Sequence, residues 1–275
     1  MNFDVELVGK IGSMALVDKE HGEIDYNKFV RVSRFLRPGM IWVSSGATVI
    51  GRYDYIRRHG HEIEGNPDEA KADYSAQGQA ILMQTYRNFI DGRYSVRQVL
   101  LEHNHFNDEV KREHIKGLLI RCAKQNAIPI INYNDCVSSE ENRKWEIEKL
   151  KSKHLAPVVE LVDNDETASQ VACLVNSRRL VILTNLDGIY RDLSDPTSLI
   201  REISGKDAYE VIENIEIAKR SCMGASRAGA NGAGAKLEYI KPCIEKGTEV
   251  IIASSRFDME DILADKVPCT KIRVR

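Results

Sequence analysis

The sequence lacks the features that mark membrane, nucleic-acid-binding and disulfide-rich proteins. No apolar run reaches the roughly 20 residues that a membrane helix needs, and the opening Met-Asn-Phe-Asp-Val-Glu has no signal-peptide pattern. The 39 basic and 41 acidic residues give a formal net charge of -2, which favours neither nucleic acid nor an anionic membrane. Its six cysteines form no CxxC pair, which favours reduced thiols. We therefore expect a soluble, cytoplasmic protein.

Several functional motifs are also missing. No Walker A spacing occurs, and there is no internal repeat or composition break that demands a second domain. His103-Asn104-His105 has the letters of a nuclease or metal motif, but no further ligands follow at a usable spacing. We interpret these histidines as loop residues. The length of 275 residues suits one large α/β domain or two smaller ones.

Two apolar segments run directly into clusters of acids and amides. Ala127–Ile131 leads to Asn132, Asn134 and Asp135, and Pro157–Val162 leads to Asp163, Asn164 and Asp165. Apolar runs of this length are typical of buried strands in a parallel sheet. Because ligands bind beyond the carboxyl ends of such strands, we expect the polar side chains to face one crevice.

Other segments have the pattern of strands and helices. We predict further strands at Phe3–Val8, Met40–Val43, Val96–Leu101, Leu180–Leu183 and Glu249–Ala253. We predict helices capped by Asp25, led by Gly78-Gln79, over Asn107–Asn126, beginning at Asp165, over Ala208–Lys219 and starting near Lys236. His59–Asp73 is polar and looks like an exposed excursion.

Glycine-rich stretches allow two interpretations each. Gly9–Ser13 with Lys10 is either a plain turn after the first strand or a phosphate-binding backbone. Ser44–Ala47 is either a tight turn that needs only Gly46 or a helix start that approaches an anion. Ser221–Gly234, just before Lys236, is either a flexible linker or a cradle for phosphates. Likewise, Ser138–His154 is either a solvated helix or hairpin, or a lid.

In chain order, these pieces resemble the motifs of the amino acid kinase superfamily, most closely the glutamate 5-kinases of proline biosynthesis. The resemblance runs from about Val8 to Arg256 and rests on Lys10-Ile-Gly-Ser13 (K-x-G-S/T), Val43-Ser-Ser-Gly-Ala47 with Gly51 (T-S-G-A-x-x-x-G), Gly78-Gln79, Gln98-Val-Leu-Leu101, Ile128-Pro-Ile-Ile-Asn-Tyr-Asn-Asp135 (V-P-I-x-N-E-N-D), Asp163-Asn-Asp165 (G-D-N-D), Leu183-Thr-Asn-Leu-Asp-Gly-Ile-Tyr190 (L-T-D-x-D-G-L-Y) and Ala235-Lys236-Leu237 (G-T-G-G-M-x-T-K).

The sequence departs from the family pattern at a few positions. Tyr133 replaces a Glu, Val162 replaces the Gly before D-N-D, and Asn185 replaces an Asp. Gly229–Lys236 lacks the Met and Thr of the glycine-rich motif. We find no counterpart of the C-terminal RNA-binding-like PUA domain that many glutamate 5-kinases carry.

The resemblance implies a fold and an organisation. The fold is α/β, with an open, mainly parallel sheet flanked by helices on both faces, as in carbamate kinase-like proteins. Residues 1–275 form a single kinase domain, with an acceptor-binding part up to about residue 165 and a nucleotide-binding part over 166–275. The implied assembly is a homo-oligomer, a dimer or a tetramer.

The implied activity is the ATP-dependent phosphorylation of the γ-carboxylate of L-glutamate, with Mg²⁺ carried by the nucleotide and no metal ligands from the protein. The implied residues are catalytic Lys10, Lys236 and Asp165; acceptor-binding Ser45, Gly46, Asp135 and Asn164; and nucleotide-binding Gly12, Ser13, Thr184, Asn185, Asp187, Tyr190, Asn231, Gly232 and Gly234. The partner is a small molecule, without nucleic acid or membrane.

Two alternatives stay open. One is a kinase of the same superfamily that acts on another small carboxylate, phosphonate or phosphate. The other is a non-catalytic sensor of a nucleotide or an amino acid. Loss of Lys10, Lys236 or Asp165 would favour the sensor, and all three are present, so an enzyme is preferred.

Overall fold

The computed structural model describes residues 2–138, 140–153, 158–222 and 232–275. The strands are β1 (Val5–Ile11), β2 (Val17–Asp18), β3 (Glu23–Ile24), β4 (Met40–Ser44), β5 (Ser95–Leu101), β6 (Ala127–Tyr133), β7 (Ser177–Thr184), β8 (Ile189–Tyr190), β9 (Leu199–Ile200), β10 (Glu202–Gly205), β11 (Glu249–Ser254) and β12 (Cys269–Val274).

The helices are interspersed among these strands along the chain. They are α1 (Tyr26–Phe35), α2 (Ala47–His59), α3 (Pro67–Phe89), α4 (Asn104–Asn107), α5 (Glu109–Lys124), α6 (Glu140–Lys153), α7 (Asn164–Leu174), α8 (Ala208–Cys222), α9 (Ala233–Tyr239), α10 (Lys241–Glu245) and α11 (Met259–Leu263), with short 3₁₀ turns η1 (Ser13–Ala15) and η2 (Pro196–Ser198). In the described part of the chain, none of the helices has the length and hydropathy to span a bilayer.

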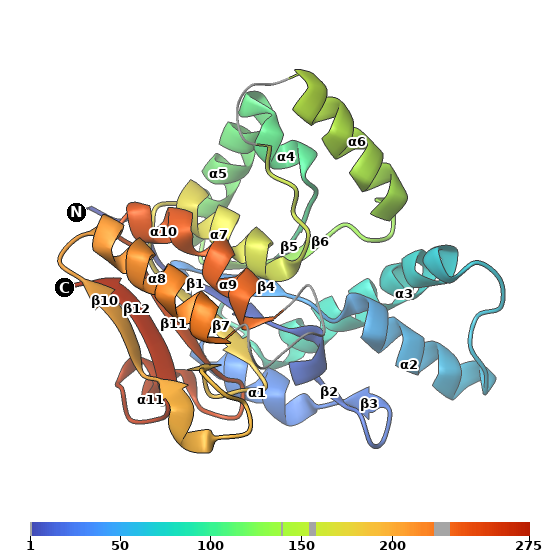
Figure 1. Cartoon of the computed structure of the whole chain (residues 1–275). Helices are drawn as coiled ribbons and strands as arrows, with labels where there is room; N and C mark the ends of the chain where they lie inside the picture. Colours follow the sequence, from blue (N-terminus) through green and yellow to red (C-terminus); the bar gives the residue numbers. More distant parts are fainter. Residues whose placement is uncertain (1, 139, 154–157, 223–231) are drawn as a thin grey trace. The chain divides into compact units, whose positions relative to one another are not determined.

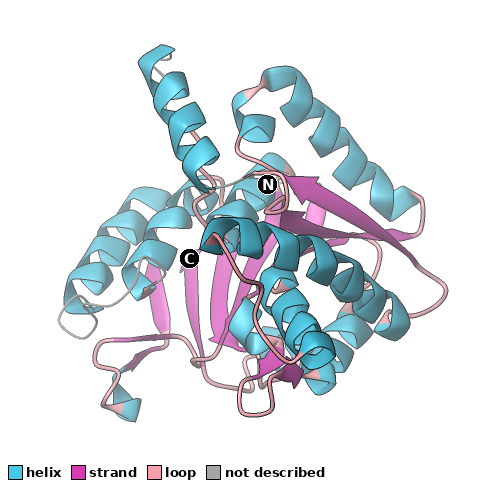
Figure 2. Ribbon diagram, turned by 90° about the vertical axis from the view of Figure 1, so that its right-hand side faces the viewer, coloured by secondary structure: helices cyan, strands magenta, loops and turns pink. Residues whose placement is uncertain are grey.

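An eight-stranded sheet is the centre of the fold, in the order β10-β12-β11-β7-β1-β4-β6-β5 (Figures 1 and 2). The pairs β1–β7, β7–β11, β5–β6 and β10–β12 are parallel, and β11–β12 is antiparallel. Helices flank the sheet (Figure 2). The predicted fold class is confirmed.

The chain forms two compact units that are interleaved in sequence. The first unit comprises Met1–Ile11, Gly39–Val43 and Asp163–Arg275, and the second unit comprises Gly12–Pro38 and Ser44–Val162. The chain therefore passes between the units several times.

In the first unit, the buried strands β1, β7 and β11 lie side by side (Figure 1). Helix α7 packs on β1 and β7, α10 packs on β11, and α8 packs on β10 and β12. Strand β1 extends further than predicted, because Lys10 and Ile11 continue the ladder opposite Ile182 and Leu183 of β7. The predicted turn at Gly9–Ser13 is therefore wrong for its first residues. Lys10 belongs to a strand, and the chain turns only at Gly12, which precedes η1.

In the second unit, helices α2 and α3 lie side by side (Figure 1). Their axes approach closely at two glycines. A Cβ atom on Gly51 would lie 1.8 Å from the carbonyl oxygen of Tyr74, and one on Gly78 would lie 1.8 Å from that of Ala47. These two glycines of the recognised motifs therefore serve helix packing.

The start of helix α1 agrees with the prediction from the sequence, whereas the start of α3 does not. The side chain of Asp25 accepts hydrogen bonds from the backbone N–H groups of Asn27 and Lys28, so the predicted cap of α1 is confirmed. By contrast, α3 begins at Pro67, eleven residues before Gly78, and Asn66 caps it. The prediction of an exposed excursion over His59–Asp73 is thus wrong from Pro67 onward, because an Asn-Pro pair followed by acidic residues starts a helix there.

The predicted strand at Pro157–Val162 is also wrong for the described residues. Residues 158–162 form no strand. The backbone of Val159 is instead held by the side chain of Asn107, which accepts from its N–H at 2.9 Å and donates to its carbonyl at 2.7 Å. Leu161 has a φ of 49°, in the left-handed region that breaks an extended segment.

Candidate active site

A carboxylate lies between two lysines in the first unit. Lys10 lies in β1, Asp165 at the start of α7 and Lys236 in α9. An oxygen of Asp165 lies 2.6 Å from Nζ of Lys10, and its other oxygen lies 2.8 Å from Nζ of Lys236. The contacts expected of these residues are present, and their catalytic roles stay predictions.

Burial makes this cluster electrostatically strong. The side chains of Lys10, Asp165 and Lys236 are exposed by only 9%, 3% and 15%. Burial acts to raise the pKa of Asp165, but the two lysine charges and their hydrogen bonds outweigh it, and the pKa is lowered. Asp165 therefore stays ionised and holds both ammonium groups at one point. Two fixed positive charges side by side suit an anionic ligand such as a phosphoryl group.

The loop before α7 positions Asp165. Asp163 caps this helix, accepting hydrogen bonds from the N–H groups of Asp165 and Glu166 at 2.8 and 2.9 Å. Burial, followed by the neighbouring charge of Asp165, raises the pKa of Asp163. Asn164 is the first residue of α7 and thus lies in the first unit, beside Asp165.

The predicted nucleotide residues of the first unit lie at the carboxyl end of β7. Thr184 ends that strand, and its hydroxyl accepts a hydrogen bond from the N–H of Leu186 at 2.9 Å. Asp187 pairs with Arg256, which follows β11, at 2.6 Å. Burial, then the Asp187 carboxylate, raises the pKa of Tyr190 in β8. Asn185, between Thr184 and Asp187 in the chain, is exposed.

The remaining predicted nucleotide residues are more dispersed. Gly232 precedes α9, and Gly234 lies in its first turn, two residues before Lys236. Asn231 and most of the predicted cradle lie outside the described residues. Gly12 and Ser13 directly follow β1 but belong to the second unit.

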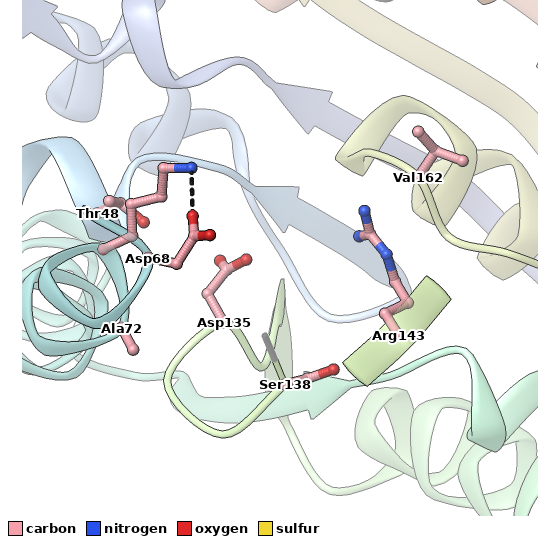
Figure 3. Close-up of a pocket in the computed structure, with 8 residues that line it drawn as sticks. Thr48, Asp68, Ala72, Asp135, Ser138, Arg143 and Val162 are labelled. Atoms are coloured by element: carbon pink, nitrogen blue, oxygen red, sulfur yellow. Dashed lines mark hydrogen bonds and ion pairs between the residues drawn. The ribbon is translucent and has the colours of Figure 1, made fainter. Parts of the chain in front are cut away.

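The second unit contains a polar pocket of about 220 Å³ (Figure 3). Its lining carries charges of both signs and two hydroxyls, and consists of Thr48, Asp68, Lys71, Ala72, Asp135, Ser138, Arg143 and Val162. Of the predicted acceptor residues, Asp135 is thus in this pocket. Ser45 and Gly46 come just before α2, the helix that contributes Thr48. Gly46 has a φ of 111° and directly precedes α2, so this position requires a glycine.

Asp135 has an unusual environment in the pocket. Burial raises its pKa to about 6, and the charge of Arg143 counteracts this only in part. Lys71, in contrast, forms an ion pair with Asp68 at 3.0 Å, which Figure 3 shows as a dashed line. A carboxylate with a raised pKa in a pocket is typical of a binding or catalytic site.

Sequence comparison now adds to this geometry. Residues 6–254 match the model of the amino acid kinase family. The chain belongs to this family. It is 29% identical over 268 residues to the glutamate 5-kinase of Streptococcus suis, a match that covers 92% of this chain but only 65% of that protein. It is 28% identical over 271 residues to the glutamate 5-kinase of Clostridium perfringens, a match that covers 94% of this chain and 90% of that protein.

The fold of this family is seen in solved structures. The carbamate kinase from Giardia lamblia bound to AMP-PNP superposes with a TM-score of 0.60 at 15% identity, over 98% of each chain. At this identity the likeness concerns the fold alone.

Two features of this amino acid kinase could not be found from the motifs. Arg143 comes from the charged segment Ser138–His154, which forms α6 in its described part. Thr48 belongs to the small-residue segment after β4. Their charge and hydroxyl were visible in the sequence, but nothing indicated that they share a pocket with Asp135.

The side chains of this amino acid kinase that could coordinate a divalent metal ion are spread over the structure in its described part. Among the described residues, no three His, Cys, Asp or Glu side chains lie close enough together to hold one. Mg²⁺ that arrives with ATP would be coordinated mainly by phosphate oxygens and water, as its strong hydration favours.

Proposed function

We propose that this chain transfers the γ-phosphoryl group of ATP to the γ-carboxylate of L-glutamate, forming γ-glutamyl phosphate, the first step of proline biosynthesis. The observation that carries the proposal is Asp165 between Lys10 and Lys236, at 2.6 and 2.8 Å. The glutamate 5-kinase relatives, at 28 and 29% identity, support the choice of acceptor.

In this proposal, the first unit neutralises the moving phosphoryl group. A carboxylate oxygen of the acceptor attacks the γ-phosphorus, and the bond from this phosphorus to the bridging oxygen breaks, so that ADP leaves. Charge builds up on the phosphoryl oxygens and the bridging oxygen, and Lys10 and Lys236 stabilise it. Asp165 contacts the lysines, so we assign it a positioning role. When bound, Mg²⁺ supplies further positive charge to the phosphates.

The remaining predicted residues have supporting roles. Gly12, Ser13, Gly232 and Gly234 would offer backbone N–H groups to phosphates, and Thr184, Asn185, Asp187 and Tyr190 would line the nucleotide side. Ser45, Gly46, Asp135 and Asn164 would bind the acceptor. In this proposal, the chain has an acceptor-binding part up to about residue 165 and a nucleotide-binding part beyond it. It assembles as a homo-oligomer.

Hydroxylamine trapping tests this function directly. Phosphorylation of a carboxylate gives an acyl phosphate, which hydroxylamine converts to a hydroxamate. With Mg-ATP, L-glutamate and hydroxylamine, we expect glutamyl hydroxamate to accumulate. Aspartate should be a poor acceptor, because its carboxylate is one methylene short and a misplacement of about 1 Å can cost about a hundredfold in rate.

The other outcomes distinguish the alternatives. ATP consumption without hydroxamate from any carboxylic acid would favour a different acceptor class, such as a phosphate or phosphonate. Nucleotide binding without turnover of any acceptor would favour a sensor.

A further inference from the structure

The pocket of the second unit contains a carboxylate and a guanidinium that do not pair with each other. Asp135 and Arg143 both line it (Figure 3). Arg143 influences Asp135 only through its charge, and among the described residues Asp135 forms neither a hydrogen bond nor an ion pair. A half-buried carboxylate without a partner is costly unless a ligand supplies one.

Arg143 is held in place by its neighbours. Its guanidinium lies over the ring of Tyr133, 5.5 Å from the centroid, and donates to the carbonyl of Leu161 at 3.0 Å. The Tyr133 hydroxyl is in turn hydrogen-bonded to Ser138 at 2.9 Å. Leu161 adopts its left-handed φ of 49° beside this contact. Backbone strain of this kind often accompanies a binding site.

Helix α6, which carries Arg143, is itself anchored. Glu146, one turn further along, lies 2.9 Å from Nε2 of His103. His103 is 1% exposed and lies in a turn, so the interpretation as a loop residue holds for it, whereas His105 belongs to α4 (Asn104–Asn107). His103 precedes α4 in the interior of the second unit, and burial lowers its pKa. The guanidinium is therefore presented by a fixed helix, which reduces the entropy that ligand binding must overcome.

The chemistry of the pair defines a ligand class. A carboxylate binds an ammonium group, and a planar guanidinium binds a second carboxylate in a two-pronged geometry. The other pocket cation, Lys71, already pairs with Asp68. A volume of about 220 Å³ is below the range of drug-sized ligands and suits a small metabolite.

We propose that Arg143 binds the α-carboxylate of the acceptor while Asp135 binds its α-ammonium group, so that the pocket selects α-amino acids. This inference rests on the proposed function, because it assigns the acceptor site of that reaction. Of the two residues that replace family residues, Val162 lines the same pocket and Tyr133 lies under the Arg143 guanidinium.

The test removes the guanidinium from the protein and the α-carboxylate from the ligand. Arg143→Gln should raise the KM for L-glutamate about 10- to 100-fold, the range for lost hydrogen bonds to a charged group, with kcat and the KM for ATP little changed. Turnover of 4-aminobutyrate, which lacks the α-carboxylate, should be poor and equal in the wild type and the variant. Arg143→Lys should restore glutamate binding in part.

Lys144→Gln is the matched control, because it removes the neighbouring, exposed charge of the same helix. This variant should leave the KM for L-glutamate, the KM for ATP, kcat and the turnover of 4-aminobutyrate unchanged. An Arg143→Gln variant that loses activity on glutamate and 4-aminobutyrate to the same extent would indicate a structural role and overturn the inference. So would an unchanged KM for glutamate.

A binding measurement separates this inference from the proposed function. Calorimetric titration with L-glutamate and 4-aminobutyrate needs no turnover. If the wild type forms no hydroxamate but binds glutamate, and Arg143→Gln abolishes only this binding, the inference stands and the proposed reaction fails. If hydroxamate forms but Arg143→Gln binds glutamate normally, the inference alone fails. Absence of glutamate binding to the wild type overturns the inference.

Discussion

Replacing Asp135 with asparagine should stabilise the protein while it removes a charge that binds the acceptor. Burial raises the pKa of Asp135 to about 6, against an ordinary value of 3.8. The folded state therefore binds the proton more tightly than the unfolded state. The resulting penalty on folding is absent below the unfolded pKa, grows as the pH rises towards 6, and is fully present above it.

The magnitude follows from the shift. About two pKa units correspond to about 3 kcal/mol at neutral pH. Residual solvation of the pocket reduces this, so we expect Asp135→Asn to raise the free energy of unfolding by about 1 to 3 kcal/mol at pH 7.5. Below pH 4 the two proteins should have nearly equal stability.

Urea unfolding of both proteins between pH 4 and pH 8 measures this difference. Asp73→Asn, which neutralises an exposed carboxylate in α3 of the same unit, is the control and should show no such growth with pH. A difference between Asp135→Asn and the wild type that stays constant across this range would refute the reasoning. A wild type that is more stable than the variant at pH 7.5 would refute it as well.

Two further predictions concern packing and charge. Gly51→Ala should destabilise the protein by several kcal/mol in thermal unfolding, because its Cβ would lie 1.8 Å from a backbone carbonyl of α3. The control Gly92→Ala should be nearly neutral in the same assay, because no atom lies within 4 Å of its Cβ. Lys10→Ala and Lys236→Ala should each lower kcat by about a hundredfold or more in steady-state kinetics, as for other lost electrostatic donors. Nucleotide affinity should change less. Turnover at the wild-type rate would remove that lysine from the proposed mechanism.

Local patterns determined most of the elements of this chain. The apolar runs at Ala127–Ile131 and Leu180–Leu183 lie in β6 and β7, because buried parallel strands require continuous apolar residues on both faces. Asp25 caps α1 for an equally local reason, since its carboxylate reaches N–H groups two and three residues ahead. The same sequence motifs identified the family.

Local patterns failed where distant side chains decide the backbone. Residues 158–162 have the composition of a strand, but the side chain of Asn107 forms hydrogen bonds with the backbone N–H and carbonyl of Val159. In addition, Leu161 has a left-handed φ, which interrupts the extended backbone. A polar side chain 52 residues away cannot be seen in a window of neighbouring residues. Composition also gave no indication that Gly51 and Gly78 would face each other across two helices.

The functional groups divide in the same way. The resemblance to the amino acid kinase motifs singled out Lys10, Asp165 and Lys236, although they are far apart in the chain. Only the tertiary structure brought both ammonium groups within 3 Å of the Asp165 carboxylate, and only it placed Arg143 in the pocket of Asp135. The physical reason is that hydrophobic periodicity and caps act over a few residues. Ion pairs, burial and the pKa of a carboxylate depend instead on which segments the fold packs together.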